Sequence, residues 1–390
     1  MKNHAATHPT PLRVSDVGPA PDHFIRLVVD HHLLLPAAAL IALVWANTAS
    51  ESYFRFSHAT AFAVNEIAMA FFLGLLMQEV MEAMMPGGPL HTWRRWGMPL
   101  IAAAGGIVGA VATYLAYVQL KYEVVLTQAW PIACAIDLAA AYYALKMVWR
   151  RGSALPFLLL LALASNIFGV LVIAFQPSTL IFNFAGVLLM GAALGVAVVL
   201  RLRKVRSFVP YLAISGPLSW WALYLVGIHP AFALIPVVPF LPRQPRSLDV
   251  FADPQDDGAV HHFEHEWNAL VQLILFLFVL VNAGVILRGY GTGTWALLAA
   301  GLIGRPLGIL LAVGLALVMG LHLPRRIGWR GLIVIGLATS SGFTFALFLA
   351  TGLLAPGPLL TEIKIGALST VAAAFVAMAA ARLLRVGRFA

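Results

Sequence analysis

Long uninterrupted apolar runs alternate with short polar segments along almost the whole chain. A helix needs roughly 20 apolar residues to cross a bilayer, whereas a membrane strand alternates apolar and polar residues. Because these runs are continuously apolar, they favour spanning helices over a barrel. The pattern predicts about twelve helices, although the run near 230–242 is short and rich in proline, so its limits are poorly defined. The runs lie near 32–48, 60–85, 97–118, 125–147, 155–175, 179–200, 208–226, 230–242, 268–288, 294–320, 331–354 and 359–382.

Composition places the chain in lipid rather than in water. Its residues are 61% hydrophobic and 11% charged, whereas a soluble domain is about 45–50% apolar and about 25% charged. No soluble core hides this much apolar surface. We therefore expect an all-α polytopic membrane protein with one transmembrane domain over 31–385. The polar residues 1–30 lack a signal-peptide pattern and are expected to form a cytoplasmic tail.

Positive charge follows every second predicted helix. The formal net charge is +9, yet the alternate loops hold only Arg55, Lys121 and Arg288. This placement argues against nucleic-acid binding, because loops rich in Lys and Arg mark the cytoplasmic side of a membrane protein. We expect both termini to lie in the cytoplasm. The clusters are Arg94 and Arg95, Lys146 with Arg150 and Arg151, Arg201 with Arg203, Lys204 and Arg206, Arg243 and Arg246, Arg325 with Arg326 and Arg330, and Arg382 with Arg385 and Arg388.

The longest polar connection, near 243–267, gathers histidines and carboxylates. Such a cluster can bind metal or sense pH, since histidine titrates near neutrality; a solvated acidic loop is the alternative. The spacing does not require a metal, and the single cysteine, Cys134, excludes a cysteine metal cluster and an internal disulfide. No cofactor or metal is therefore expected. The ionisable residues are Asp249, Asp253, Asp256, Asp257, Glu264, Glu266, His261, His262 and His265.

Two of the predicted helices look interrupted. In the first, Pro131 removes a backbone donor and Asp137 follows among apolar residues. In the second, a small and polar stretch stands in the middle of an apolar run. An ordinary kink explains either one alone, but broken helices at corresponding positions of two halves point to a transporter's binding site. The second interruption includes Ser340, Ser341, Gly342 and Thr344.

Several short motifs follow one another in a distinctive order. They read N-E at 65–66, M-A-F-F-L at 69–73, P-L-I-A-A-A-G-G at 99–106, G-I-H at 227–229, N-A-G-V at 282–285, I-G-R-P-L-G at 303–308 and G-F-T at 342–344. In this order and spacing, over about 35–384, the chain resembles the NhaA family of sodium/proton antiporters. The resemblance implies an inverted-repeat fold with two broken, crossing helices. It also implies a secondary transporter in a bacterial-type inner (plasma) membrane, with both termini in the cytoplasm. An enzyme is not expected, since the chain has no HExxH or GxSxG motif.

The resemblance also implies roles for residues at the crossing. Asp137 matches the family's aspartate in the break of the fourth helix, where a carboxylate offsets positive helix ends. Arg305 replaces a family lysine near the negative helix ends; a guanidinium does not release a proton, whereas a buried lysine can. Ile136 stands where the family has a threonine near the ion site.

The family's adjacent pair of aspartates is missing. Aligned without a gap, Asn166 and Ile167 stand at the pair, and a one-residue shift would place Ser165 and Asn166 there. In the family, sodium and protons compete for these carboxylates, and a dehydrated Na⁺ needs hard oxygen ligands and negative charge. If Arg305 points inward and Asp137 neutralises it, the net charge of the site is near zero and not negative. We therefore expect altered or lost Na⁺/H⁺ exchange.

Three outcomes are compatible with that expectation. The protein moves a different solute, an anion or a neutral polar molecule, with Arg305, Asn166 and helix N-termini as donors. Alternatively it keeps some cation/proton exchange through Asp137, or it is a non-transporting membrane subunit or sensor. The expected partners are the lipid bilayer and Na⁺ and H⁺ or another small solute. The family often forms homodimers through a hairpin between the first two helices, and the short connection 49–58 suggests a reduced hairpin here.

The resemblance further implies a pH-response region, and with it a part in pH homeostasis. Glu66, Glu79 and Glu82 lie along the second long helix, and His229 matches a family histidine linked to pH response. An interfacial glutamate and a structural histidine are the alternatives for these residues.

Overall fold

The computed structural model describes residues 34–84, 93–149, 154–174, 183–205, 207–241, 272–287, 290–323 and 327–389. These residues are helical with connecting turns and contain no strand, which confirms the predicted all-α class. The predicted tail, residues 1–30, and the acidic connection 243–267 lie outside them. The elements are α2 (Leu34–Thr48), α3 (Ser50–Phe62), η1 (Ala63–Ala68), α4 (Met69–Met84), α5 (Trp93–Leu120), η2 (Val124–Cys134), α6 (Leu138–Val148), α7 (Ala154–Ala174), α8 (Phe184–Leu202), η3 (Tyr211–Ser215), α9 (Gly216–Val226), η4 (Pro230–Phe232), η5 (Val238–Phe240), the helix Gln272–Asn282, α11 (Thr292–Ala299), η6 (Ala300–Gly304), α12 (Arg305–Val318), α13 (Trp329–Ala338), α14 (Phe343–Leu353), α15 (Pro358–Ser369), α16 (Ala372–Leu383) and η7 (Gly387–Phe389).

Membrane-length helices account for much of the described chain. Within the described ranges, five helices are long and apolar enough to cross a membrane, and the pair α13 and α14, bent by 49°, makes a sixth span. Shorter apolar helices, among them α2 and Gln272–Asn282, fall within other predicted runs. The long helices are Ser50–Gln78, Gly97–Leu120, Phe184–Leu202, Thr292–Val318 and Pro358–Phe389.

Two predicted boundaries are wrong. The sequence predicts a short connection over 49–58, but the chain is helical from Ser50, and α3 continues through η1 into α4. Glu51 in the first turn and its ion pair to Arg55, at 2.7 Å, favour this helix despite its polar and exposed sequence. The run near 230–242 is not a span: it forms the short turns η4 and η5, because its prolines lack the backbone donors that a long helix needs.

Helices α5 and α12 cross with their backbones in contact. A Cβ added to Gly109 would collide with the carbonyl oxygen of Gly304, and one added to Gly308 with that of Gly105. Small residues four apart allow membrane helices to approach this closely. Because Arg305 follows Gly304 directly, the contact fixes the position of its side chain beside α5.

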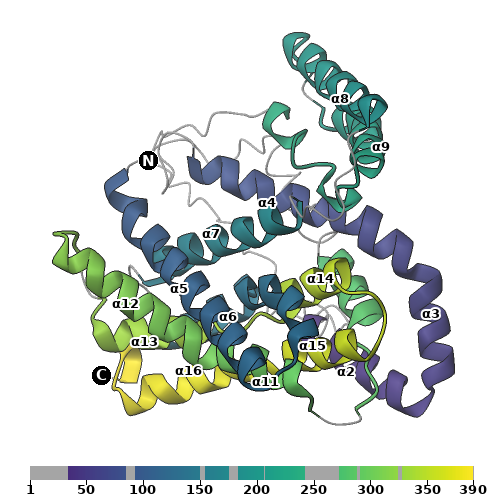
Figure 1. The fold of residues 1–390 in the computed structure, drawn as a ribbon. Coiled ribbons are helices and arrows are strands. Elements are labelled where there is room, and N and C mark those ends of the chain that lie inside the picture. Colours follow the sequence, from purple (N-terminus) through teal and green to yellow (C-terminus); the bar gives the residue numbers. More distant parts are fainter. Residues whose placement is uncertain are drawn as a thin grey trace, which may run out of the picture.

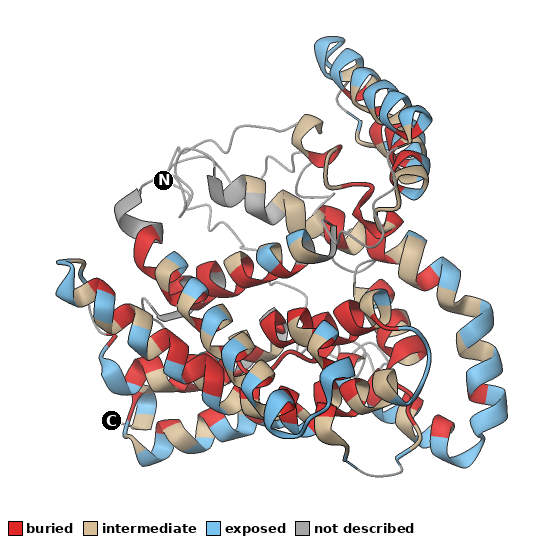
Figure 2. Ribbon diagram, viewed as in Figure 1, coloured by how far each residue is buried: buried red, intermediate tan, exposed pale blue. Residues whose placement is uncertain are grey.

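Burial is concentrated where the two interrupted helices meet. Every residue from Phe343 to Ala350 on α14 is buried, so this helix is enclosed on all sides. Figure 2 shows the same concentration of buried residues around α6, α13 and α14. By contrast, α8 and α9 pack on each other at one edge of the molecule (Figure 1) and expose apolar side chains such as Leu188 and Trp221, as lipid-facing helices do. The crossing is therefore the interior of this membrane protein.

Candidate functional site

The two breaks contact each other directly through their backbones. The first break runs from Ala135 to Asp137, between η2 and α6, and the second separates α13 from α14. The Asp137 N–H donates to the carbonyl oxygen of Ser341 at 2.6 Å, and a Cβ on Gly342 would lie 3.0 Å from the Ala135 carbonyl oxygen. Glycine at 342 therefore permits the close approach. Pro131 lies within η2, buried, one turn before the first break.

The Asp137 carboxylate caps two helices at once. Its Oδ1 accepts the Ala140 N–H at 3.0 Å in the first turn of α6. Its Oδ2 accepts the Thr344 N–H at 3.1 Å and the Thr344 hydroxyl at 2.7 Å at the start of α14. Helix N-termini carry partial positive charge, so one buried carboxylate offsets both of them. Only 5% of Asp137 is exposed, and its oxygens are committed to these donors.

The Asn166 side chain binds the first break from α7. Its Nδ2 donates to the carbonyl oxygen of Ile136 at 3.0 Å, and its Oδ1 accepts the Ile136 N–H at 3.2 Å. The amide thus pairs with both backbone groups of one residue, as a neighbouring strand would. Both Asn166 and Ile136 are buried, Ser165 is buried beside them, and Ile167 is partly exposed. Asn166 is therefore engaged with the backbone.

Arg305 lies at the opposite helix ends from Asp137. Its Nη2 donates to the Ala133 carbonyl oxygen at 2.5 Å, at the C-terminal end of η2. Free carbonyl groups make such an end partly negative, which suits a guanidinium. Arg305 and Asp137 are the two buried charged side chains among the described residues, and no ion pair joins them there. Whether the two residues pair is an open question in the sequence; in the structure the Asp137 carboxylate caps two positive helix ends, and Arg305 binds a carbonyl oxygen at a negative one.

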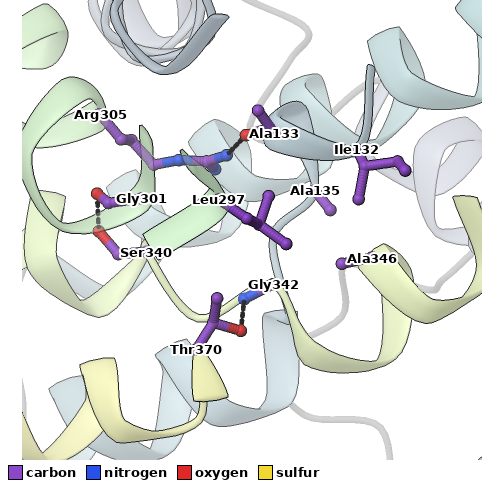
Figure 3. Close-up of a pocket in the computed structure, with 10 residues that line it drawn as sticks. All are labelled: Ile132, Ala133, Ala135, Leu297, Gly301, Arg305, Ser340, Gly342, Ala346 and Thr370. Carbon is purple, nitrogen blue, oxygen red and sulfur yellow. Dashed lines mark hydrogen bonds between the residues drawn. The ribbon is translucent and has the colours of Figure 1, made fainter. Parts of the chain in front are cut away.

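A cavity of about 10 Å³ lies between the breaks, the size of one water molecule (Figure 3). The Ser340 hydroxyl beside it lies within hydrogen-bond distance of two carbonyl oxygens, that of Gly301 at 2.5 Å and that of Gly336 at 2.9 Å, and its one proton is donated to either or shared. The Arg305 Nε is buried and has no hydrogen-bond partner in the described structure. The lining residues are Ile132, Ala133, Ala135, Leu297, Gly301, Arg305, Ser340, Gly342, Ala346 and Thr370.

Sequence reasoning missed Thr370 as part of this site. The Thr370 hydroxyl accepts the Gly342 N–H at 3.1 Å and donates to Ala367 at 2.6 Å, so it holds the second break from the chain between α15 and α16. The signal in the sequence is the polar pair Ser369 and Thr370 in an apolar run. Ser341 does belong to the second break, as predicted, and its hydroxyl is buried without a partner among the described residues.

The residues linked to pH response form a separate contact. His229 Nδ1 lies 3.5 Å from Glu66 Oε2 and accepts the Ala231 N–H at 3.3 Å. Glu66 belongs to η1, a π-helical turn between α3 and α4. The side chains of Glu79 and Glu82 lie outside the described residues, as does the His/Asp/Glu connection. No group of three metal-ligating side chains occurs in the part of the chain that the structure describes.

Sequence comparisons with a protein-family model and with individual proteins all point to the same family. The model of the family described as Na+/H+ antiporter 1 matches residues 22–383. The Na(+)/H(+) antiporter NhaA of Geotalea uraniireducens (strain Rf4) is 37% identical over 374 residues, which cover 93% of this chain and 97% of the relative. The protein of that name from Desulfitobacterium hafniense (strain DSM 10664 / DCB-2) is 37% identical over 382 residues, covering 93% and 96%. The one from Jannaschia sp. (strain CCS1) is 33% identical over 411 residues, covering 93% and 98%.

The relatives' names describe antiporters, which are transporters rather than enzymes. The family match spans nearly the whole chain, and the helical membrane fold with two broken helices agrees with it. This chain therefore belongs to the Na+/H+ antiporter family of membrane transport proteins.

Proposed function

We propose that this protein keeps the transporter fold of its family but does not perform ordinary Na⁺/H⁺ exchange. The observation that carries the proposal is the double hydrogen bond between Asn166 and Ile136. The residue that replaces a family carboxylate is neutral, and both polar atoms of its amide bind backbone. It brings no negative charge to a cation, its oxygen is already held by the Ile136 N–H, and an amide takes up no proton near neutral pH.

The charges at the crossing support the same proposal. A dehydrated Na⁺ needs several hard oxygen ligands, and net negative charge to offset its lost hydration. The Asp137 carboxylate already accepts three hydrogen bonds at two helix starts. Arg305 adds a buried positive charge nearby. The sum of one negative and one positive charge disfavours a cation, and Ile136 in place of a threonine removes one more oxygen.

Transport of a small anion or neutral polar solute is the second candidate. The buried positive charge of Arg305 beside the small cavity favours it, since a guanidinium pairs with an anion or with a polar acceptor. A non-transporting membrane subunit remains the third reading of the same site. For all three, we infer a bacterial inner membrane from the relatives, both termini in the cytoplasm from the distribution of Lys and Arg, and a homodimer as the family suggests.

The test is antiport in inside-out vesicles from bacteria that lack their own sodium/proton antiporters. A ΔpH probe and a membrane-potential probe would follow additions of Na⁺, Li⁺ and K⁺, with the Geotalea uraniireducens relative as the positive control. We expect no Na⁺- or Li⁺-driven proton release above that of empty vesicles. Robust release would overturn the proposal, and its loss in Asp137→Asn would then assign the residual exchange to Asp137.

A further inference from the structure

A groove of about 460 Å³ lies away from the crossing, where α6 and α16 end and α13 begins. Trp149, Trp329 and Arg330 line it, together with Arg385 and Gly387 from the turn after α16. These three helices pack against one another near the C-terminus of the chain (Figure 1). The groove is therefore built from chain segments far apart in sequence.

Backbone geometry fixes the position of Arg385 at the rim of this groove. Arg385 has φ of +52° and Gly387 has φ of +66°, so the chain turns sharply after α16. The Val386 N–H donates to Ala381 at 2.9 Å, and its buried side chain anchors the turn. A Cβ at 387 would collide with the Val148 carbonyl oxygen, which closes this turn onto the end of α6. Arg385 is thereby held outward.

The charge around the groove is positive, and among the described residues no carboxylate pairs with it. Arg330 and Arg385 are exposed, and neither forms an ion pair with a described residue. The sequence contains no Asp or Glu from 138 to 248, from 267 to 361 or from 363 to 390, so the segments that build the groove carry none. The start of α13 at Gly328 has no side-chain cap, which leaves its first N–H groups without a side-chain acceptor.

The surroundings of the groove are those of a membrane interface. Trp149 packs its ring against Gly331, and Trp329 is 50% exposed. Tryptophan is enriched where headgroups meet acyl chains. Leu383, 84% exposed and two residues before Arg385, extends an apolar surface beside the positive rim. A ligand with an anionic head and an apolar tail matches both features.

We propose that this groove binds the phosphate headgroup of an anionic phospholipid, with Arg330 and Arg385 as its charged ligands. Basic pockets between membrane helices bind such headgroups through arginine, which matches phosphate oxygens in a bidentate manner. The site is distinct from the helix crossing, so it stands whether or not the protein exchanges sodium for protons.

The experiment measures lipid binding to the purified full-length protein in a neutral detergent. Native mass spectrometry and thermal unfolding would be followed on titration with phosphatidylglycerol, phosphatidylcholine and inorganic phosphate in parallel. We expect phosphatidylglycerol to bind and to raise the unfolding temperature, with little effect of the other two. Arg330→Gln and Arg385→Gln should each weaken binding about fivefold, and Arg385→Lys, which keeps the charge, should weaken it less.

Arg203→Gln is the matched control, since it removes one exposed arginine from the end of α8, outside the groove. Equal loss of phosphatidylglycerol binding in the control and in both groove variants would overturn the proposal. Equal stabilisation by inorganic phosphate would overturn the assignment to lipid in favour of a free anion. Unchanged binding in the double variant Arg330→Gln, Arg385→Gln would remove the site altogether.

Discussion

Asn166 and Ile136 exchange two hydrogen bonds, at 3.0 and 3.2 Å, between a helix side chain and the extended backbone of a broken helix. Buried backbone groups outside a helix need partners, and here an amide supplies both a donor and an acceptor. A carboxylate at the same place would offer acceptors only. The substitution that removes a charge thus also stabilises the break.

Removal of this amide should destabilise the protein. Asn166→Ala leaves the Ile136 N–H and C=O without their partners, at a cost of about 1–3 kcal/mol. Thermal unfolding in detergent measures the loss. Asn183→Ala, which removes one exposed hydrogen bond to the Ala185 N–H, is the control and should cost about 1 kcal/mol or less. An equal loss in the two variants would contradict the pairing as a main support of the break.

Replacement by aspartate should make that stability depend on pH. In the variant Asn166→Asp, the introduced carboxyl group can accept the Ile136 N–H, but when ionised it faces the Ile136 carbonyl oxygen as a second acceptor. A proton on the carboxyl group restores the donor. Relative to the parent protein, the variant should therefore be less stable at pH 8 than at pH 5, measured by unfolding at both pH values. If the difference in stability between variant and parent is the same at both pH values, the carboxylate turns away from Ile136.

The cap formed by Asp137 should contribute more to the free energy of unfolding than any one of its hydrogen bonds does. Asp137→Ala removes acceptors from the starts of both α6 and α14, so a loss of about 2 kcal/mol or more is expected. Thr344→Val removes only the hydroxyl donor, with a loss of about 1 kcal/mol. Asp137→Asn keeps an oxygen but removes the charge, and should fall between them. A variant Asp137→Ala no less stable than Thr344→Val would argue against a shared cap.

The glycines between α5 and α12 should not tolerate even a methyl group. Gly308→Ala places a Cβ against the Gly105 carbonyl oxygen, so the helices must separate, and we expect a loss of about 2 kcal/mol or poor accumulation in the membrane. Gly195→Ala on α8 is the control, since its added Cβ would meet no atom within 4 Å. There the better helix propensity of alanine should leave stability unchanged or slightly raised. Thermal unfolding and membrane yield measure both.

Restoration of the family's side chains should restore exchange if these positions caused its loss. The combined variant Ile136→Thr, Asn166→Asp, Ile167→Asp, Arg305→Lys returns carboxylates and a titratable lysine to the crossing. Vesicles that contain it should show Na⁺- or Li⁺-driven proton release, and the further change Asp137→Asn serves as its control. A folded, inserted variant without release would show that the change of function lies elsewhere in the chain.

The sequence predicted the class of fold and both breaks, because apolar length and misplaced polar residues report directly on helices in lipid. Pro131 and the stretch at 339–344 are such signals.

Sequence did not predict that Arg305 and Asp137 lie at different helix ends, since the charges of helix ends depend on how segments cross in space. It also missed Thr370, whose hydroxyl matters only because Gly342 folds against it. The helix from Ser50 was missed because its polar composition hides one buried anchor, Tyr53, whose hydroxyl donates to the carbonyl oxygen of Val281.

The glycine contact between α5 and α12 has a consequence for motion. Two backbones in direct contact, with no side chains between them, leave no room for one helix to slide or rotate past the other. Arg305 is therefore carried with α5 and α12 as one rigid body. Any change in the shape of the crossing must then come from movement of the neighbouring helices around this pair.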